Sequence, residues 1–206
     1  MRIHFALFLI VMLAACTGTE TDSDISSIDP NFFNLTDYVE LQKTRLANTP
    51  ITKTVSVNGI EETQKITAVD WELELAPFVQ SNIDRPALWD SYAMDSVSCQ
   101  GLKKLVYLSN DADNFTKSLE VTYVDVSKPL DSVYAVYIRN GFESYIANTS
   151  QQLIFWDGGY EIRSTQAAVL SEERALNIIG TWKAEPAGAC VKTSFFESSS
   201  SPGRIN

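Results

Sequence analysis

A period of two dominates the sequence from Leu102 onward, and this alternation restricts the fold more than any other feature. Apolar and polar residues alternate in short runs, as they do in strands with one buried and one exposed face. Clusters of Gly, Asn, Asp and Ser separate the runs and predict short turns. We predict strands near 102–108, 116–125, 132–139, 142–148, 151–156, 160–167 and 177–183. Strands joined by such turns form an antiparallel meander of about six to seven strands.

A β-hairpin is predicted upstream of this region. Asn58-Gly59 lies between two alternating runs, which is typical of a two-residue type I′ turn. The turn sets the register, so one face carries the pairs Val57–Ile60 and Ile51–Ile66. The opposite face carries the pairs Ser56–Glu61, Thr54–Thr63 and Thr52–Lys65. We therefore expect one face of the hairpin to be buried and the other to be exposed to solvent.

Three helices are predicted around the hairpin. Asp29-Pro30 is typical of an N-cap followed by proline, and it predicts a first helix that ends before residue 48. The apolar face of this helix consists of Phe32, Leu35, Val39 and Leu46. Asp70 caps a second helix, in which Pro77 predicts a kink or a restart. Asp84-Arg85-Pro86 opens a short third helix that reaches Trp89 and Tyr92.

This order of elements predicts the fold class. Helices come first and strands follow, which favours an α+β fold over an α/β fold. We expect the N-terminal helices and the hairpin to pack on the C-terminal meander, within a single domain over 31–190. Residues 191–206 are rich in Ser, Pro and Gly, so a disordered tail is predicted there.

The N-terminus has the layout of a secretory signal peptide. Arg2 is followed by an apolar run over 5–13 and by Leu13-Ala14-Ala15-Cys16. This end of the chain resembles the lipobox of bacterial lipoproteins. The resemblance implies removal of residues 1–15, lipidation of Cys16 and anchoring of the chain to a membrane. Residues 16–30 are Thr-, Ser- and Asp-rich and are expected to form a flexible acidic tether.

The body of the chain carries a second, more diffuse resemblance. Its segments include Asn31-Phe32-Phe33-Asn34-Leu35, Val69-Asp70-Trp71-Glu72-Leu73, Trp89-Asp90-Ser91-Tyr92 and Gly159-Tyr160-Glu161-Ile162. In this order they resemble small lipoproteins of uncharacterised function in Bacteroidota-type Gram-negative bacteria. The resemblance implies a location in the cell envelope, where we expect the outer membrane, on its periplasmic or surface side. It brings no catalytic motif.

Charge and histidine content exclude several functions. The net charge is −10 and no basic cluster offsets it, so we expect neither nucleic acid nor a polybasic membrane surface as a partner. The acyl chains on Cys16 are then the predicted membrane contact. The only histidine, His4, lies in the signal peptide. The mature chain thus lacks histidine-based catalysis and histidine-containing metal sites, and we predict no catalytic residues, metal or cofactor.

Cysteine usage predicts a disulfide. With Cys16 acylated, Cys99 and Cys190 remain as a pair in an oxidising compartment. A bond between them is favoured because Cys99 opens the β-rich half and Cys190 follows its last strand. The alternative is two buried thiols that are not linked. Separately, the oxygen-rich segment 110–114 begins like a calcium loop but lacks its glycine and distal glutamate, which favours a polar turn.

These observations favour a non-enzymatic envelope lipoprotein with a binding or assembly role. The sequence does not identify its partner, and another envelope protein and a glycan are the two candidates. A first alternative is a carrier of an apolar ligand or lipid, in a cavity lined by strand aromatics. These aromatics are Tyr123, Tyr134, Tyr137, Tyr145, Phe155, Trp156 and Tyr160. A second alternative is a histidine-independent glycan hydrolase, which needs two carboxylates about 5–10 Å apart.

Overall fold

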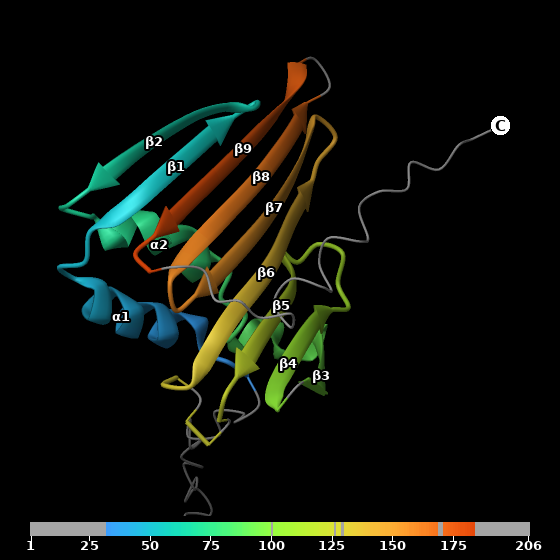
Figure 1. Cartoon of the computed structure of the whole chain (residues 1–206). Coiled ribbons are helices and arrows are strands. Elements are labelled where there is room, and N and C mark those ends of the chain that lie inside the picture. Colours follow the sequence, from blue (N-terminus) through green and yellow to red (C-terminus); the bar gives the residue numbers. More distant parts are fainter. Residues whose placement is uncertain (1–31, 100, 126, 129, 169–170, 184–206) are drawn as a thin grey trace, which may run out of the picture. The chain divides into compact units, whose positions relative to one another are not determined.

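The computed structural model of the chain describes residues 32–99, 101–125, 127–128, 130–168 and 171–183. In this part of the chain, helices lie against one antiparallel sheet of nine strands (Figure 1). The helices are α1 (Leu35–Leu46), α2 (Trp71–Gln80) and the 3-10 helix η1 (Pro86–Ser91). The strands are β1 (Ile51–Val57), β2 (Ile60–Ile66), β3 (Tyr92–Cys99), β4 (Leu102–Ser109), β5 (Thr116–Tyr123), β6 (Val133–Glu143), β7 (Ala147–Trp156), β8 (Gly159–Ala168) and β9 (Ser171–Thr181). The α+β character and the antiparallel meander are confirmed, but the prediction of six to seven strands is wrong.

The sheet gains its two additional strands from the hairpin. Strands β3 to β9 are neighbours in chain order, and β1 then pairs with β9, so the order is β2-β1-β9-β8-β7-β6-β5-β4-β3. The hairpin therefore extends the sheet edge to edge instead of packing on its face. Its predicted register is confirmed from Ile51–Ile66 to Val57–Ile60. Its predicted buried face is covered at one end only, because Ile51 is 1% exposed while Ile60 is 80% exposed.

Local capping explains where the helices begin. The Asp70 carboxylate accepts hydrogen bonds from the backbone of Glu72 and Leu73, so the predicted N-cap of α2 is confirmed. The helix continues through Pro77 without a restart. The side chain of Asn34 caps α1, which begins at Leu35. The predicted start at Asp29 is therefore wrong, although Asp29 and Pro30 themselves lie outside the described residues.

The main core lies between the helices and one face of the sheet. Phe155 of β7 packs edge-on against Tyr38 of α1 and Phe78 of α2, with ring centroids 5.6 and 5.8 Å apart. One polar cluster crosses this interface: Glu74 of α2 pairs with Lys53 of β1 at 2.6 Å and accepts a hydrogen bond from the Tyr160 hydroxyl. Burial and this carboxylate both raise the pKa of Tyr160. These contacts fix α2 over the β1–β9–β8 region.

Three strand predictions need correction. The predicted strands 132–139 and 142–148 leave a turn at Asn140-Gly141, but β6 runs through both residues and ends at Glu143. The predicted strands 142–148 and 151–156 are replaced by one strand, β7. Strand β3 was not predicted at all, since most of its side chains are exposed and the sequence does not alternate there. Each error falls where tertiary contacts or an edge position override the local pattern.

Candidate functional site

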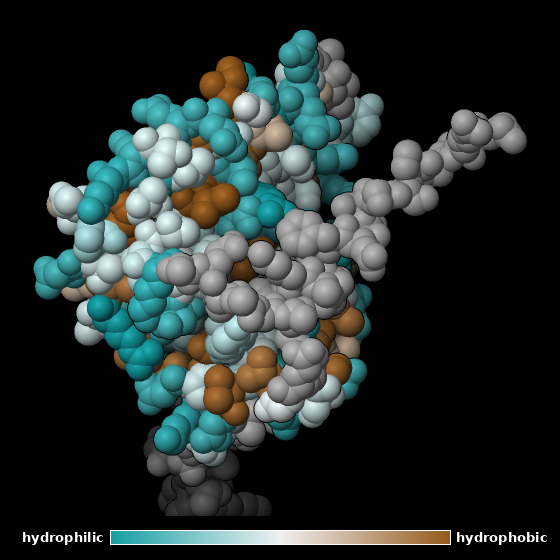
Figure 2. Space-filling model, viewed as in Figure 1, coloured by the Kyte–Doolittle hydropathy of each residue, from teal (hydrophilic) through white to brown (hydrophobic). Residues whose placement is uncertain are grey.

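One face of the sheet carries no helix in the described part of the chain. Phe155 and Tyr160 point toward the helices, so by strand alternation their neighbours point to the other side. We call this other side the open face. It faces the viewer in Figures 1 and 2, where pale and teal side chains over β2, β1 and β9 are interrupted by small apolar patches.

A polar groove crosses the open face. It consists of two adjoining depressions of about 280 and 420 Å³, which share Ser150, Gln152 and Thr165. The first is lined by Ser56, Gly59, Ser150, Gln152, Arg163, Ser164, Thr165, Ala175, Leu176 and Asn177. The second adds Lys117, Arg139, Asn140, Gly141, Glu143, Asn148, Thr149, Ala167 and Glu173. From β1 to β5 the groove spans five strand spacings, or about 24 Å.

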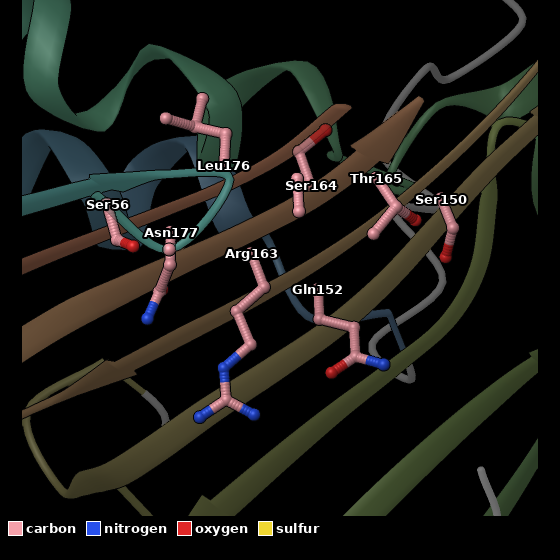
Figure 3. Close-up of a pocket in the computed structure, with 10 residues that line it drawn as sticks. Ser56, Ser150, Gln152, Arg163, Ser164, Thr165, Leu176 and Asn177 are labelled. Atoms are coloured by element: carbon pink, nitrogen blue, oxygen red, sulfur yellow. The ribbon is translucent and has the colours of Figure 1, made fainter. Parts of the chain in front are cut away.

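One row of residues forms the floor of the groove. In register across five neighbouring strands it contains Ser56, Asn177, Arg163, Gln152 and Arg139. Figure 3 shows Arg163, Gln152 and Asn177 projecting to one side, and Leu176 and Ser164 to the other. The row thus presents amide, hydroxyl and guanidinium groups toward solvent.

Hydrogen bonds orient both arginines of this row. Nε of Arg163 donates to Glu161 of the same strand at 2.7 Å, and Nε of Arg139 donates to Ser118 of β5 at 3.1 Å. Among the described residues, Asn177 Oδ1 is buried without a hydrogen-bond partner. An acceptor left in that state is destabilising by about 1–3 kcal/mol.

Next to the groove, the open face carries apolar side chains that are buried. Ala135, Tyr137 and Trp156 are only 6–7% exposed, although they lie outside the core beneath the helices. Burial raises the pKa of Tyr137, while Arg139 and Arg163 oppose the increase. Lys104 and Glu120 form an ion pair of 3.1 Å on the same face. The open face therefore has an apolar zone and a polar zone, and the groove lies in the polar one.

Most of the predicted site residues lie elsewhere. Cys16 and Cys190 are outside the described residues, and Cys99 ends strand β3, so the disulfide stays a prediction. The strand aromatics are divided: Tyr123, Phe155 and Tyr160 belong to the core, whereas Tyr145 at the β6–β7 turn is 99% exposed. They do not surround a common space.

Carboxylates of the open face are also dispersed. Glu120 and Glu161 lie on β5 and β8, which are three strand spacings apart, or about 14 Å. Each of the two carboxylates is ion-paired with a different cation, Glu120 with Lys104 and Glu161 with Arg163, so they are not arranged as the close pair that glycoside hydrolysis uses. Segment 110–114 forms the polar turn that the sequence favours, in which Asp111 accepts from Asp113 N at 2.8 Å. No group of three or more His, Cys, Asp or Glu residues in the described ranges is arranged to hold a metal ion.

The groove residues could not be predicted from the sequence. Ser150, Gln152, Arg163 and Asn177 are polar residues on one side of their strands, which is also the pattern of any solvent-exposed strand face. The missing information is which face the helices cover. Within the described segments, no helix is long and apolar enough to cross a membrane. No protein-family model matches the chain, and neither a curated protein nor a solved structure matches it.

Proposed function

We propose that this chain is a lipid-anchored, non-enzymatic binding protein of the bacterial envelope, and that it holds a glycan in the groove of its open face. The observation that carries the proposal is the floor of the groove, where the amides of Gln152 and Asn177 lie among arginine and hydroxyl side chains. Amides and hydroxyls both donate and accept hydrogen bonds. Sugar hydroxyls do the same, so the two surfaces are chemically complementary.

The form of the groove supports an extended ligand. It is open along its length and crosses six strands, which suits a chain of several sugar units. A protein partner would be bound more effectively by exposed aromatic anchors and an apolar centre. The groove lining contains no aromatic residue and only small apolar ones apart from Leu176, whose side chain points away in Figure 3.

The other two candidate functions have less support. A lipid carrier needs an enclosed apolar cavity, whereas both depressions described above are open and lined by polar side chains. A hydrolase needs paired carboxylates, whereas Glu120 and Glu161 are each ion-paired with a different cation. In the proposed function, Cys16 contributes only location, because its acyl chains keep the domain at the membrane surface.

Binding of the full chain to polysaccharides tests this proposal. The lipoprotein is purified in detergent and titrated with soluble neutral and acidic polysaccharides by isothermal calorimetry. We expect binding that Gln152→Ala and Asn177→Ala each weaken about fivefold or more, as loss of a hydrogen bond predicts. Gln64→Ala, on the exposed edge strand β2, is the matched control and should bind like the wild type.

A second measurement separates the glycan from a protein partner. The native lipoprotein and a Cys16→Ala variant are used to pull down partners from solubilised envelopes. Polysaccharide recovered with both forms supports the proposal. Recovery of one protein without polysaccharide, together with no heat of binding to any polysaccharide, would replace the glycan with a protein ligand.

A further inference from the structure

Two arginines flank Gln152 at the centre of the groove. Arg139 and Gln152 are register partners across β6 and β7, and Gln152 and Arg163 are partners across β7 and β8. The two arginines are thus two strand spacings apart, or about 10 Å between their Cα atoms. Arginine side chains are long enough to reach from both sides toward a group above Gln152.

The surrounding charges make this position suitable for an anion. Glu161 lies beside Arg163 and accepts a hydrogen bond from its Nε. Arg139 has no carboxylate as a register partner, since its neighbour on β5 is Ser118. Lys117 also lines the groove, beyond Arg139. The acidic lining residues Glu143 and Glu173 lie at the outer end, about four residues or 13 Å along the strands from the arginine row.

We propose that Arg139, Gln152 and Arg163 form a subsite for an anionic oxygen group on the bound glycan, so that the ligand is an acidic polysaccharide. This inference rests on the proposed function and names the class of its ligand. Guanidinium groups bind carboxylate or phosphate oxygens through two parallel hydrogen bonds, and the Gln152 amide adds a further donor between them. Although the chain has a net charge of −10, these two arginines lie in one row, and the proposed subsite gives them the role of binding an anion.

The direct test compares an acidic oligosaccharide with its neutral ester and with a phosphorylated polymer. The full lipoprotein is titrated in detergent with oligogalacturonate, with its neutral methyl ester and with a phosphate-bearing polysaccharide. We expect oligogalacturonate or the phosphorylated polymer to bind about tenfold or more tightly than the ester, with a preference that decreases as salt is added. The stronger of the two charged ligands identifies the anionic group as carboxylate or phosphate.

Variants assign the preference to the row. Arg139→Gln and Arg163→Gln should each weaken binding of the charged ligand about tenfold more than binding of the ester. Arg174→Gln, which removes an exposed arginine outside the groove, is the control and should keep the preference. Thermal unfolding verifies that each variant is folded. If loss of the Glu161 ion pair unfolds Arg163→Gln, the comparison uses Arg139→Gln only.

The outcomes distinguish the two proposals. Equal affinity for the acid, the phosphorylated polymer and the ester would overturn the anionic subsite but keep the glycan function. A charge preference that survives in both arginine variants would also overturn the subsite. Absence of binding to all three ligands would overturn the proposed function itself.

Discussion

At the scale of single residues, two glycines allow aromatic rings to lie flat on the sheet. Gly180 of β9 pairs with Tyr160, and Gly159 of β8 pairs with Trp156. A Cβ atom at Gly159 would lie 2.6 Å from the Trp156 ring, and one at Gly180 would overlap the ring of Tyr160. Tyr160 lies on the helix side and Trp156 on the open face. On each face of the sheet, an aromatic ring therefore packs in the space that a glycine on the neighbouring strand leaves free.

Replacing Gly180 should be costly. We expect Gly180→Ala to lower the free energy of unfolding by about 1–3 kcal/mol, because the methyl group displaces Tyr160 from Glu74 and from its packing. Urea unfolding measures the change. Gly141→Ala is the control, since its Cβ would meet the flexible Lys117 side chain at 3.2 Å and the Thr149 carbonyl at an ordinary 3.9 Å. A change within about 0.5 kcal/mol is expected. Equal stabilities of the two variants would contradict this view of Gly180.

At the scale of elements, the hairpin shows what local sequence can and cannot predict. Asn58-Gly59 determines the register of β1 and β2, because both residues adopt positive φ angles of 50° and 85°. The pairing of β1 with β9 cannot be predicted from local sequence. Its contacts join Asn58 to Ala175, which is 117 residues away, and no local pattern specifies a partner at that distance.

The same limit explains the errors at Asn140 and Cys99. Asn140-Gly141 has the composition of a turn, yet Asn140 is 3% exposed and donates to Ser81 and Gln151 at 2.8 and 2.9 Å. Ser81 follows α2, so a helix 59 residues upstream decides that this asparagine belongs in a strand. Edge strand β3, which ends at Cys99, has no second neighbour and needs no alternating pattern.

Substitutions at Asn58 test how the turn is held. The backbone N–H of Asn58 donates to Ala175 at 2.9 Å, and its Oδ1 accepts from Ala175 N at 2.8 Å. We expect Asn58→Ala to destabilise by about 2 kcal/mol, since it loses the side-chain bond and places a Cβ in the left-handed region. Asn58→Gly should lose only the bond, about 1 kcal/mol. Urea unfolding compares them, and equal losses would mean that φ at this position carries no cost.

At the scale of the whole molecule, the two faces of one sheet have different roles. The helix side contains the core, and α1 and α2 close it (Figure 1). The open face carries the groove, whose lining comes from six strands that are dispersed over more than 100 residues of sequence. Sequence patterns predicted most of the strands but not the site, because a site of this kind exists only once the strands are in register.

The position of each strand in the sheet predicts its dynamics. Strands β2 and β3 are the edges, and nearly all side chains of β2 are exposed. Strands β6, β7 and β8 lie between two neighbours each and contribute Val136, Ile138, Leu153 and Tyr160, all 0% exposed. Edge strands open by local fluctuations, whereas central strands exchange only when much of the sheet opens.

Hydrogen exchange followed by mass spectrometry measures this gradient on the full chain in detergent. Peptides from β6, β7 and β8 should exchange about 100-fold more slowly than those from β2 and β3, a difference of about 2.7 kcal/mol in opening free energy. Protection of β2 equal to that of β7 would contradict an open edge, because it would require another strand to pair with β2. Charged residues Glu61, Glu62 and Lys65 on β2 disfavour such pairing, so we expect the edge to stay open.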